Sequence, residues 1–493
     1  MDGLSRAVHG TLVPGFEGCT SDLPTWLRRR LEHGLAGVVL FARNVEADLR
    51  GLTDAVRAER PSALVAVDEE GGDVTRLEAA TGSRHPGALA LGALDDPDTT
   101  RRVAASIGAM LARAGVDWNW APVADVTSNP RNPVVGVRSF GTEAHAVARH
   151  VSATVRGLQD DSGILACAKH FPGHGDTDVD SHLGLPTVSS SRHDLETGAL
   201  LPFRAAIDAG VASVMTGHLR MLAVDPDLPA TFSSVVLRSL LRDELGFSGV
   251  VVSDALEMRG ATTGHGIGEA AVLAVRAGVD ALCLGGHLAD DDVVTQVHDA
   301  LVGAVRQGDL AEERVVDAAA RVAALADRRG PNRTSADDPV AGRVLDLAEC
   351  TAIARRTLAV TGTVALAAGP VLVVVCDPAA SIPAGVVPWG VTEQLRARRE
   401  SVVELLVSER DPAPDAADHE GPVVLVLRDA ARHGWQRAVE SAIVGGRPDT
   451  VVVELGVPAQ PPPSDAARIT AYGASRSSTA AVVALLTDPE GRP

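Results

Sequence analysis

Lysine is almost absent from this chain. Of its 493 residues 45 are Lys or Arg, and Lys169 is the only lysine among them. A lysine kept in so arginine-rich a sequence is expected to do what arginine cannot, which is to place a compact ammonium group in a tight space. The alternative is that Lys169 is a neutral survivor with no function of its own.

Cysteine and long apolar segments are also scarce. The five cysteines are scattered and odd in number, which predicts reduced thiols and excludes a disulfide framework or a zinc site. No apolar run approaches the roughly 18–20 residues of a membrane span, so we expect no membrane partner. The first residues show no basic segment before an apolar stretch, so we expect no secretory signal and a cytoplasmic location.

Basic residues are fewer than acidic residues. The 45 Lys and Arg residues against 64 Asp and Glu residues give a net charge of −19. This charge repels phosphate backbones, so we expect no nucleic-acid partner. Apolar residues make up 45% of the chain and charged residues 22%, which is typical of a folded globular protein.

Residues 1–330 repeat one local pattern. A short β-branched run ends in polar or glycine residues, and an amphipathic Ala-, Leu- and Arg-rich stretch follows. Unbroken apolar runs indicate strands buried on both faces, and their alternation with helices indicates a parallel sheet. Eight such units predict an α/β fold whose N-terminal domain is a (β/α)8 TIM barrel. The predicted strands lie in HGTLVPGF, GVVLFARN, ALVAVDEEGG, VDWNWAPVADV, GILACAKHFPG, SVMTGHL, GVVVSDAL and DALCLGG.

A second α/β pattern follows the predicted barrel. Residues 329–341 are polar and rich in turn-forming residues, and a long helix is predicted over 342–360. Linker and connecting helix together are assigned to 331–360. Residues 361–493 hold further apolar runs and predict a smaller C-terminal α/β sandwich domain, in which we find no chemical motif.

The segment Lys169–His182 carries most of the reactive groups, with three histidines, three aspartates and the lysine. It begins at the carboxyl end of a predicted strand, where barrels place their reactive groups. One interpretation is an acid–base site, in which Asp180 holds the tautomer of His182 and raises its pKa. The other is a metal site. Its ligands would come from His170, His174, Asp176 and His182, although His174 and Asp176 could simply brace the loop.

Asp254 ends the apolar strand of GVVVSDALEM. A carboxylate at the mouth of a barrel suits a nucleophile, and retaining glycoside hydrolysis needs one beside an acid–base partner. Asp254 alone could instead cap the following helix. Together with the loop it favours glycosidic chemistry. Polar residues recur at the other predicted strand ends as well: Asp68, Glu69, Asp125, Lys169, His170 and His218.

Four segments resemble glycoside hydrolase family 3, and within it the NagZ-like β-N-acetylglucosaminidases (β-N-acetylhexosaminidases) of bacterial cell-wall recycling. The segments are VDEEGGDVTRL, NPVVGVRSFG, KHFPGHGDTDVDSHLGLP and ELGFSGVVVSDALEM. The resemblance implies a retaining hydrolase that releases terminal non-reducing β-linked GlcNAc from peptidoglycan fragments (muropeptides). It implies no metal and no organic cofactor.

The resemblance also assigns residues. It implies that Asp254 is the nucleophile, that His182 is the acid–base residue and that Asp180 is its partner. It further implies that five residues bind the sugar: Lys169, His170, Asp68, Arg76 and Arg138. One departure is Asp73, where the family often has arginine. It reverses a charge near Arg76 and leaves the preferred leaving group open.

Other functions stay open at this stage. A histidine acid–base residue avoids a second anion beside Asp254, which favours phosphate as the acceptor and so a β-N-acetylglucosaminide phosphorylase yielding GlcNAc-1-phosphate. A family 3 β-glucosidase is a further alternative. A metal-dependent barrel hydrolase would need a His-x-His sequence at an early strand end, which is not found. A non-catalytic sugar-binding protein would not need intact catalytic positions.

Overall fold

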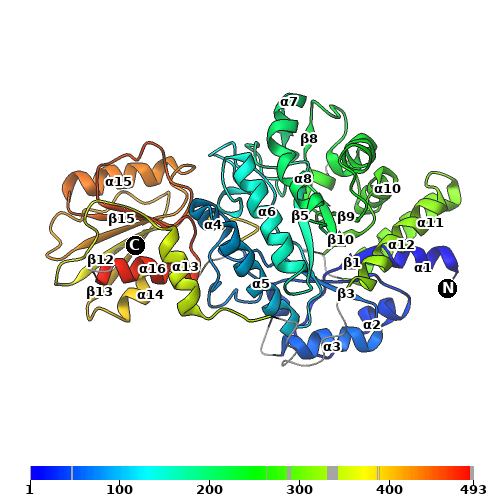
Figure 1. Cartoon of the computed structure of the whole chain (residues 1–493), viewed down its shortest axis with the longest axis horizontal. Coiled ribbons are helices and arrows are strands. Elements are labelled where there is room, and N and C mark those ends of the chain that lie inside the picture. Colours follow the sequence, from blue (N-terminus) through cyan, green and yellow to red (C-terminus); the bar gives the residue numbers. More distant parts are fainter. Residues whose placement is uncertain are drawn as a thin grey trace. The chain divides into compact units, whose positions relative to one another are not determined.

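The chain divides into two compact units, which together contain the elements labelled in Figure 1. The first unit comprises Met1–Glu69, Thr100–Val126 and Thr142–Val344, and the second comprises Glu70–Thr99, Thr127–Gly141 and Leu345–Pro493. The computed structural model describes residues 2–45, 48–262, 264–285, 290–329, 342–385, 387 and 389–488. All of the linker predicted at 329–341 except its first residue lies outside the described residues.

Each of the eight predicted N-terminal segments contains a strand. Six strands form one parallel sheet in the order β2-β3-β4-β5-β7-β9, and β1 pairs in parallel with β10. A single parallel bridge joins Val252 of β9 to Ala281, just before β10. The strands of the first unit are β1 (Leu12–Pro14), β2 (Gly37–Leu40), β3 (Leu64–Val67), β4 (Trp118–Asn119), β5 (Leu165–Phe171), β7 (Ser213–Thr216), β9 (Val250–Ser253), β10 (Leu282–Leu284) and the short pair β6 (Thr187–Val188) and β8 (Arg220–Met221).

The strands of the first unit are apolar on both faces because both faces are buried. Alternate residues, such as Leu64 and Ala66 of β3 or Val250 and Val252 of β9, share one buried cluster. The residues between them, such as Val251, are also fully buried. Since burying a Val or Leu side chain stabilises the fold by roughly 1.5–3 kcal/mol, this explains the unbroken apolar runs.

The helices of the first unit follow the predicted amphipathic stretches. Among the described residues, no helix is long and apolar enough to cross a membrane. The α-helices are α1 (Gly3–His9), α2 (Thr25–Glu32), α3 (Leu49–Glu59), α5 (Pro97–Arg113), α6 (Ala144–Gln159), α7 (Arg192–Asp194), α8 (Leu201–Asp208), α9 (Arg259–Thr262), α10 (Ile267–Ala277), α11 (Asp291–Gln307) and α12 (Glu312–Asp327), and the π-helices are Leu195–Ala199 and Val235–Glu244.

The second unit is built on a mixed six-stranded sheet in the order β11-β16-β15-β14-β12-β13, in which only the β11–β16 pairing is antiparallel. Its strands are β11 (Ala359–Thr361), β12 (Val371–Cys376), β13 (Val402–Val407), β14 (Val423–Leu427), β15 (Val451–Glu454) and β16 (Arg468–Thr470). Its helices are α4 (Ala88–Leu94), α13 (Leu347–Thr357), α14 (Val391–Arg396), α15 (Gly434–Gly446) and α16 (Arg476–Thr487).

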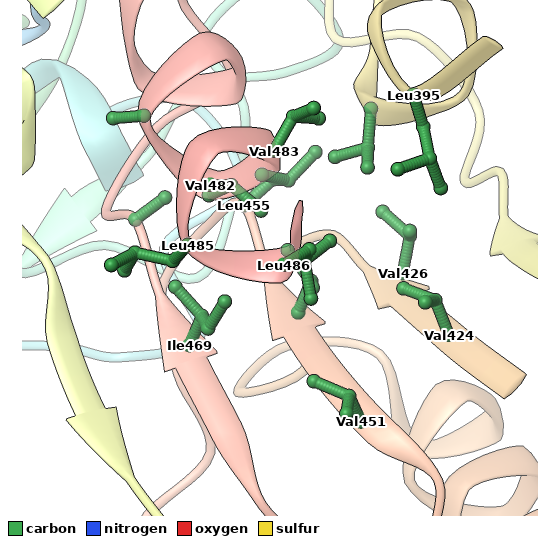
Figure 2. Packing of buried hydrophobic residues seen from close by; sticks show 14 of the residues in the cluster. Leu395, Val424, Val426, Val451, Leu455, Ile469, Val482, Val483, Leu485 and Leu486 are labelled. Atoms are coloured by element: carbon green, nitrogen blue, oxygen red, sulfur yellow. The ribbon is translucent and has the colours of Figure 1, made fainter. Parts of the chain in front are cut away.

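Helices cover both faces of this sheet. Val424 and Val426 of β14 pack in one buried cluster with residues of α13, α14 and α16 (Figure 2). Leu425 and Leu427, which point to the opposite face, pack in another cluster with residues of α15. The C-terminal part therefore has three layers, with a buried apolar core on each side of the sheet.

The helix predicted over 342–360 is too long at both ends. Asp346 begins α13, because its side chain accepts the backbone N–H of Glu349 while the Glu349 carboxylate accepts that of Asp346. The helix ends at Thr357, and the next residues form β11, paired with β16. The prediction was wrong there because this pairing joins residues about a hundred positions apart and leaves no local sequence signal.

Asp73 ties the segment 70–99 to the C-terminal sheet of the second unit. Its Oδ2 lies 3.1 Å from Nη2 of Arg428, and its Oδ1 accepts the backbone N–H of Ala474 at 2.7 Å. Burial raises the pKa of Asp73, and the guanidinium of Arg428 opposes that rise. The negative charge that departs from the family pattern therefore has a partner within its own unit.

We expect Leu486→Ala to destabilise the protein by about 2–5 kcal/mol, because Leu486 is 0% exposed and its loss leaves a cavity. Urea denaturation followed by circular dichroism measures the free energy of unfolding. Leu406→Ala is the matched control, since Leu406 is 60% exposed on the edge strand β13, and we expect a change within about 0.5 kcal/mol. Equal losses in the two variants would contradict the assignment of the core.

Reversing the charge at Asp73 should be repaired by reversing Arg428 as well. Asp73→Arg places two guanidinium groups together, so we expect the free energy of unfolding to fall by about 3–5 kcal/mol. The double variant Asp73→Arg/Arg428→Asp restores an ion pair and should recover at least half of that loss. Asp449→Asn is the control, because the Asp449 side chain that pairs with Arg447 is 67% exposed, and it should cost less than about 1 kcal/mol. A double variant as unstable as Asp73→Arg would refute the pairing.

Candidate active site

The side chain of Lys169 lies in a confined space, as expected for the single lysine of an arginine-rich chain. It lies on β5, and its Nζ donates a hydrogen bond to Oδ1 of Asp68, just after β3, at 2.6 Å. The side chain of Lys169 is 2% exposed and that of Asp68 is 18% exposed. Little water reaches the pair, so its electrostatic attraction is stronger than that of a surface ion pair.

His170, the next residue on β5, is oriented by Asp125. Its Nδ1 lies 2.7 Å from Oδ2 of Asp125, a carboxylate with no solvent exposure. The other oxygen of Asp125 accepts the backbone N–H groups of His170 and His174, at 3.3 and 2.7 Å. Burial disfavours the Asp125 carboxylate, but its contacts with His170 and His174 prevail and lower its pKa. Asp125 thus fixes the His170 ring.

Asp180 and His182 form a hydrogen-bonded pair in the loop after β5. Nδ1 of His182 lies 2.6 Å from Oδ1 of Asp180, and the same oxygen accepts the backbone N–H of His182 at 2.9 Å. Burial acts to raise the pKa of Asp180, but the hydrogen bonds from His182 outweigh it, so the pKa is lowered. An ionised Asp180 is suited to stabilise the protonated form of His182.

Gly260 lets this loop approach the segment that follows β9. Its backbone N–H donates to the carbonyl of Ser181 at 3.0 Å. A Cβ at Gly260 would lie 2.8 Å from Cβ of His218 and 3.0 Å from that carbonyl oxygen. Only glycine therefore fits without displacing the loop or His218.

Asp254 follows β9, and the charges of three imidazoles act on its carboxylate. Its Oδ1 accepts the backbone N–H of Ala255 at 2.8 Å. Burial acts to raise the pKa of Asp254, but the nearby rings of His170, His218 and His182 prevail, so its pKa lies below the ordinary value. The carboxylate is therefore ionised, and the charges of His170, His218 and His182 act on it.

The buried thiol of Cys167 gives further evidence that these charged side chains lie near one another. Burial raises the pKa of Cys167, on β5, to about 12. The charges of Lys169, Asp68 and Asp254 all act on this thiol. The ends of β3, β5 and β9 thus bring three of the predicted site residues together within the first unit.

The four candidate metal ligands contact different partners. His174 is buried, with Nδ1 2.9 Å from Oγ1 of Thr177, and Asp176 accepts a hydrogen bond from Ser190 at 2.8 Å. His170 and His182 face Asp125 and Asp180. Within the described ranges, no group of three His, Cys, Asp or Glu side chains is arranged to hold a metal ion. Burial lowers the pKa of His174 to about 4, and its contacts suit a residue that braces the loop.

Arg76 and Arg138 belong to the second unit. Nε and Nη2 of Arg138 donate to both carboxylate oxygens of Glu70, at 2.9 and 2.7 Å, and the two side chains are only 8% and 6% exposed. Arg76 donates from Nη1 to the carbonyl of Pro383 at 3.0 Å. Each guanidinium is thus positioned by neighbours within its own unit.

Several residues that organise this site have no role predicted from the sequence. Asp125 and His218 follow predicted strands, and that position was the available signal. His218 is fixed at Nδ1 by Oγ1 of Thr231, 2.9 Å away, and at Nε2 by the carbonyl of Ala255, 3.0 Å away. Nothing local in the sequence marks Thr231 or Gly260, because their contacts join distant segments.

Comparison with known proteins places these residues in a family. Residues 25–325 match the family described as "Glycosyl hydrolase family 3 N terminal domain". The Beta-hexosaminidase of Alkalilimnicola ehrlichii is 39% identical over 287 residues, which are 56% of this chain and 81% of that protein. Beta-hexosaminidase A of Pseudoalteromonas piscicida is 34% identical over 349 residues, 66% of this chain. The match spans only 56% of the length of that relative.

A solved structure extends the similarity to nearly the whole chain. The glycoside hydrolase family 3 beta-N-acetylglucosaminidase from Paenibacillus sp. str. FPU-7 is 32% identical and superposes with a TM-score of 0.88. The superposition covers 99% of this chain and 97% of that one. The matched family region contains β3, β5 and β9, whose ends carry the site of the first unit. The family resemblance of the sequence is confirmed: this chain is a glycoside hydrolase and belongs to glycosyl hydrolase family 3.

Proposed function

We propose that this chain is a retaining β-N-acetylglucosaminidase that removes terminal non-reducing β-linked GlcNAc from muropeptides. The coarser activity, that of a family 3 β-hexosaminidase, rests on the family match and on relatives named for it. One observation carries the finer proposal. The charge of His182 acts to lower the pKa of Asp254, and Nδ1 of His182 lies 2.6 Å from Oδ1 of Asp180, whose pKa is also lowered.

The first step forms a glycosyl-enzyme. Asp254 attacks the anomeric carbon of GlcNAc, and the bond from that carbon to the leaving oxygen breaks. Protonated His182 gives its Nε2 proton to the leaving oxygen, while Asp180 stabilises the imidazolium through Nδ1. The proton transfer leaves a neutral imidazole beside the glycosyl ester of Asp254, where a carboxylic acid would have left an anion.

The second step releases the sugar with retained configuration. Neutral His182 takes a proton from water as the water oxygen attacks the anomeric carbon, and the carboxylate of Asp254 leaves. Asp68 and Lys169 offer an acceptor and a donor to sugar hydroxyls, and His170 adds a second ring donor or acceptor. Arg76 and Arg138 are proposed to hold the ring substituents. The site residues need no metal or cofactor for either step.

The proposal includes the closed (β/α)8 barrel predicted for residues 1–330. Two observations support closure. Val252 of β9 bridges to Ala281, just before β10, and the backbone N–H of Ala36, just before β2, donates to the carbonyl of His9, the last residue of the helix that precedes β1, at 2.9 Å. The domain limits at 331–360 and 361–493 and the cytoplasmic location likewise stay predictions.

Removing the proposed nucleophile should abolish turnover. We expect Asp254→Ala to lower kcat/KM for p-nitrophenyl β-GlcNAc by about 10³-fold or more. His182→Ala should lower it by about 10²- to 10⁴-fold, because general acid–base catalysis is lost. Release of p-nitrophenol is the measurement. Ser190→Ala, which removes only the hydrogen bond to Asp176 in the outer loop, is the control and should keep wild-type rates.

The same assay separates the alternatives. Acceleration by phosphate, with GlcNAc-1-phosphate as product, would make the enzyme a phosphorylase. Preference for the β-glucoside over the β-GlcNAc substrate would make it a β-glucosidase, and loss of activity in EDTA would indicate a metal-dependent hydrolase. Full activity in Asp254→Ala would refute the mechanism.

The acid limb of the pH profile should depend on His170. Attack needs an ionised Asp254, and among the three imidazoles that counter the effect of burial, His170 lowers the pKa of Asp254 most. His170→Gln removes that effect, so the pKa of Asp254 rises and Asp254 stays protonated up to a higher pH. We therefore expect the acid limb of kcat/KM to move to higher pH, as measured across acidic pH values. If His170→Gln lowers kcat/KM but leaves the acid limb at the same pH, His170 binds the sugar and does not set the pKa of Asp254.

A further inference from the structure

His218 is a buried histidine of the first unit, and both of its ring nitrogens have a partner. It follows β7 and is 0% exposed. Its Nε2 lies 3.0 Å from the carbonyl oxygen of Ala255, and its Nδ1 lies 2.9 Å from Oγ1 of Thr231. Because a carbonyl oxygen only accepts hydrogen bonds, Nε2 carries a proton whether the ring is neutral or charged. The contact with Ala255 therefore sets the neutral tautomer of His218.

Ala255 connects this ring to the proposed nucleophile. The carbonyl of Ala255 accepts from His218, and its backbone N–H donates to Oδ1 of Asp254 at 2.8 Å. The backbone N–H of Asp254 donates to the carbonyl of Thr216, at the end of β7, at 3.2 Å. A shift of the Ala255 backbone would therefore move the N–H group that orients the carboxylate of Asp254.

The hydroxyl of Thr231 holds the ring of His218 at its second nitrogen. It also lies 2.9 Å from Oγ1 of Thr216 and 3.3 Å from the carbonyl oxygen of Gly217. The hydroxyl donates to Nδ1 of a neutral ring. It accepts from Nδ1 of a protonated ring, and its own proton then goes to the carbonyl of Gly217. Thr231 thus anchors the ring in either state and opposes its rotation.

These partners of His218 are themselves buried and tied to the end of β7. Thr216 and Thr231 are each 0% exposed. Thr231 lies in the short 3-10 helix Ala230–Phe232, and the backbone N–H of Ala230 donates to the carbonyl of Leu219 at 2.7 Å. A buried polar group that loses its partner costs about 1–3 kcal/mol, so one orientation of the ring is favoured.

A second buried histidine bonded to a threonine provides a comparison within the first unit. Nδ1 of His150, on α6, lies 2.8 Å from Oγ1 of Thr100, on α5, and both residues are buried. These two helices carry none of the predicted site residues. What distinguishes His218 is its contact with Ala255, which continues to Asp254.

We propose that His218 is a positioning residue that holds the carboxylate of Asp254 in the orientation needed to attack the anomeric carbon. It acts through the backbone of Ala255, and Thr231 fixes its ring. The inference rests on the proposed function, which makes Asp254 the nucleophile. A misdirected carboxylate leaves the sugar-binding residues in place, so loss of this support lowers the rate of attack more than the affinity for the sugar.

The test separates attack from binding. The kcat/KM for p-nitrophenyl β-GlcNAc includes the attack, whereas the inhibition constant of free GlcNAc measures binding alone. We expect kcat/KM to fall about a hundredfold in His218→Phe and about tenfold in Thr231→Val, while the inhibition constant stays within about twofold. Thr231→Ser keeps the hydroxyl and should recover most of the wild-type kcat/KM. Thr100→Val, which removes the hydroxyl beside His150, is the matched control and should keep the wild-type value.

Three results would overturn the proposal: a wild-type kcat/KM in Thr231→Val, an equal loss in Thr231→Ser, or an inhibition constant that rises as much as kcat/KM falls. The two Thr231 variants decide the question if His218→Phe does not fold.

If wild type does not hydrolyse the substrate, the proposed function fails, and the anchoring of the ring is decided by NMR of protein labelled with ¹⁵N-histidine. The His218 signal is assigned by its loss in His218→Gln. A ring protonated at Nε2 in wild type, whose Nε2 proton exchanges faster with water in Thr231→Val, supports the anchored ring. A neutral ring protonated only at Nδ1, or equal exchange in the two proteins, overturns it.

Discussion

The buried carboxylate of Asp125 fixes both the end of β5 and the start of the loop that follows it. One oxygen orients the ring of His170, and the other accepts the backbone of His174. Without this acceptor, buried donors would lose their partner at a cost of several kcal/mol. The orientation of His170 and the path of the chain toward His182 therefore depend on one side chain that need not touch a substrate.

The predicted site residues are distributed over the two units. The first carries the carboxylate of Asp254 and the pair Asp180–His182, all at strand ends or in adjoining loops. The second holds Arg138 through Glu70 and anchors Asp73 to Arg428. Arg76 and Arg138, two of the predicted substrate residues, lie within the matched family region, but they belong to the unit that contains the C-terminal sheet.

Local sequence predicted the strands well because burial on both faces leaves unbroken apolar runs, as in Leu64–Val67. It predicted too long a helix at 342–360, where pairing with β16 takes over. It could not place residues 70–99 with the C-terminal sheet, since contacts such as the ion pair of Asp73 with Arg428 join distant segments. The roles proposed for Asp254 and His182 were suggested by their positions in the sequence and assigned by family resemblance, whereas the contribution of Thr231 needed three-dimensional contacts.

The enclosure of Lys169 has a consequence for covalent labelling. The chain has no other lysine, and this one is 2% exposed and bonded to Asp68. Acylating reagents and enzymes that acetylate or ubiquitinate lysine side chains therefore meet no such target on the surface. A reagent would have to enter the site proposed for the sugar to modify Lys169, so labelling of this amine would report access to that site.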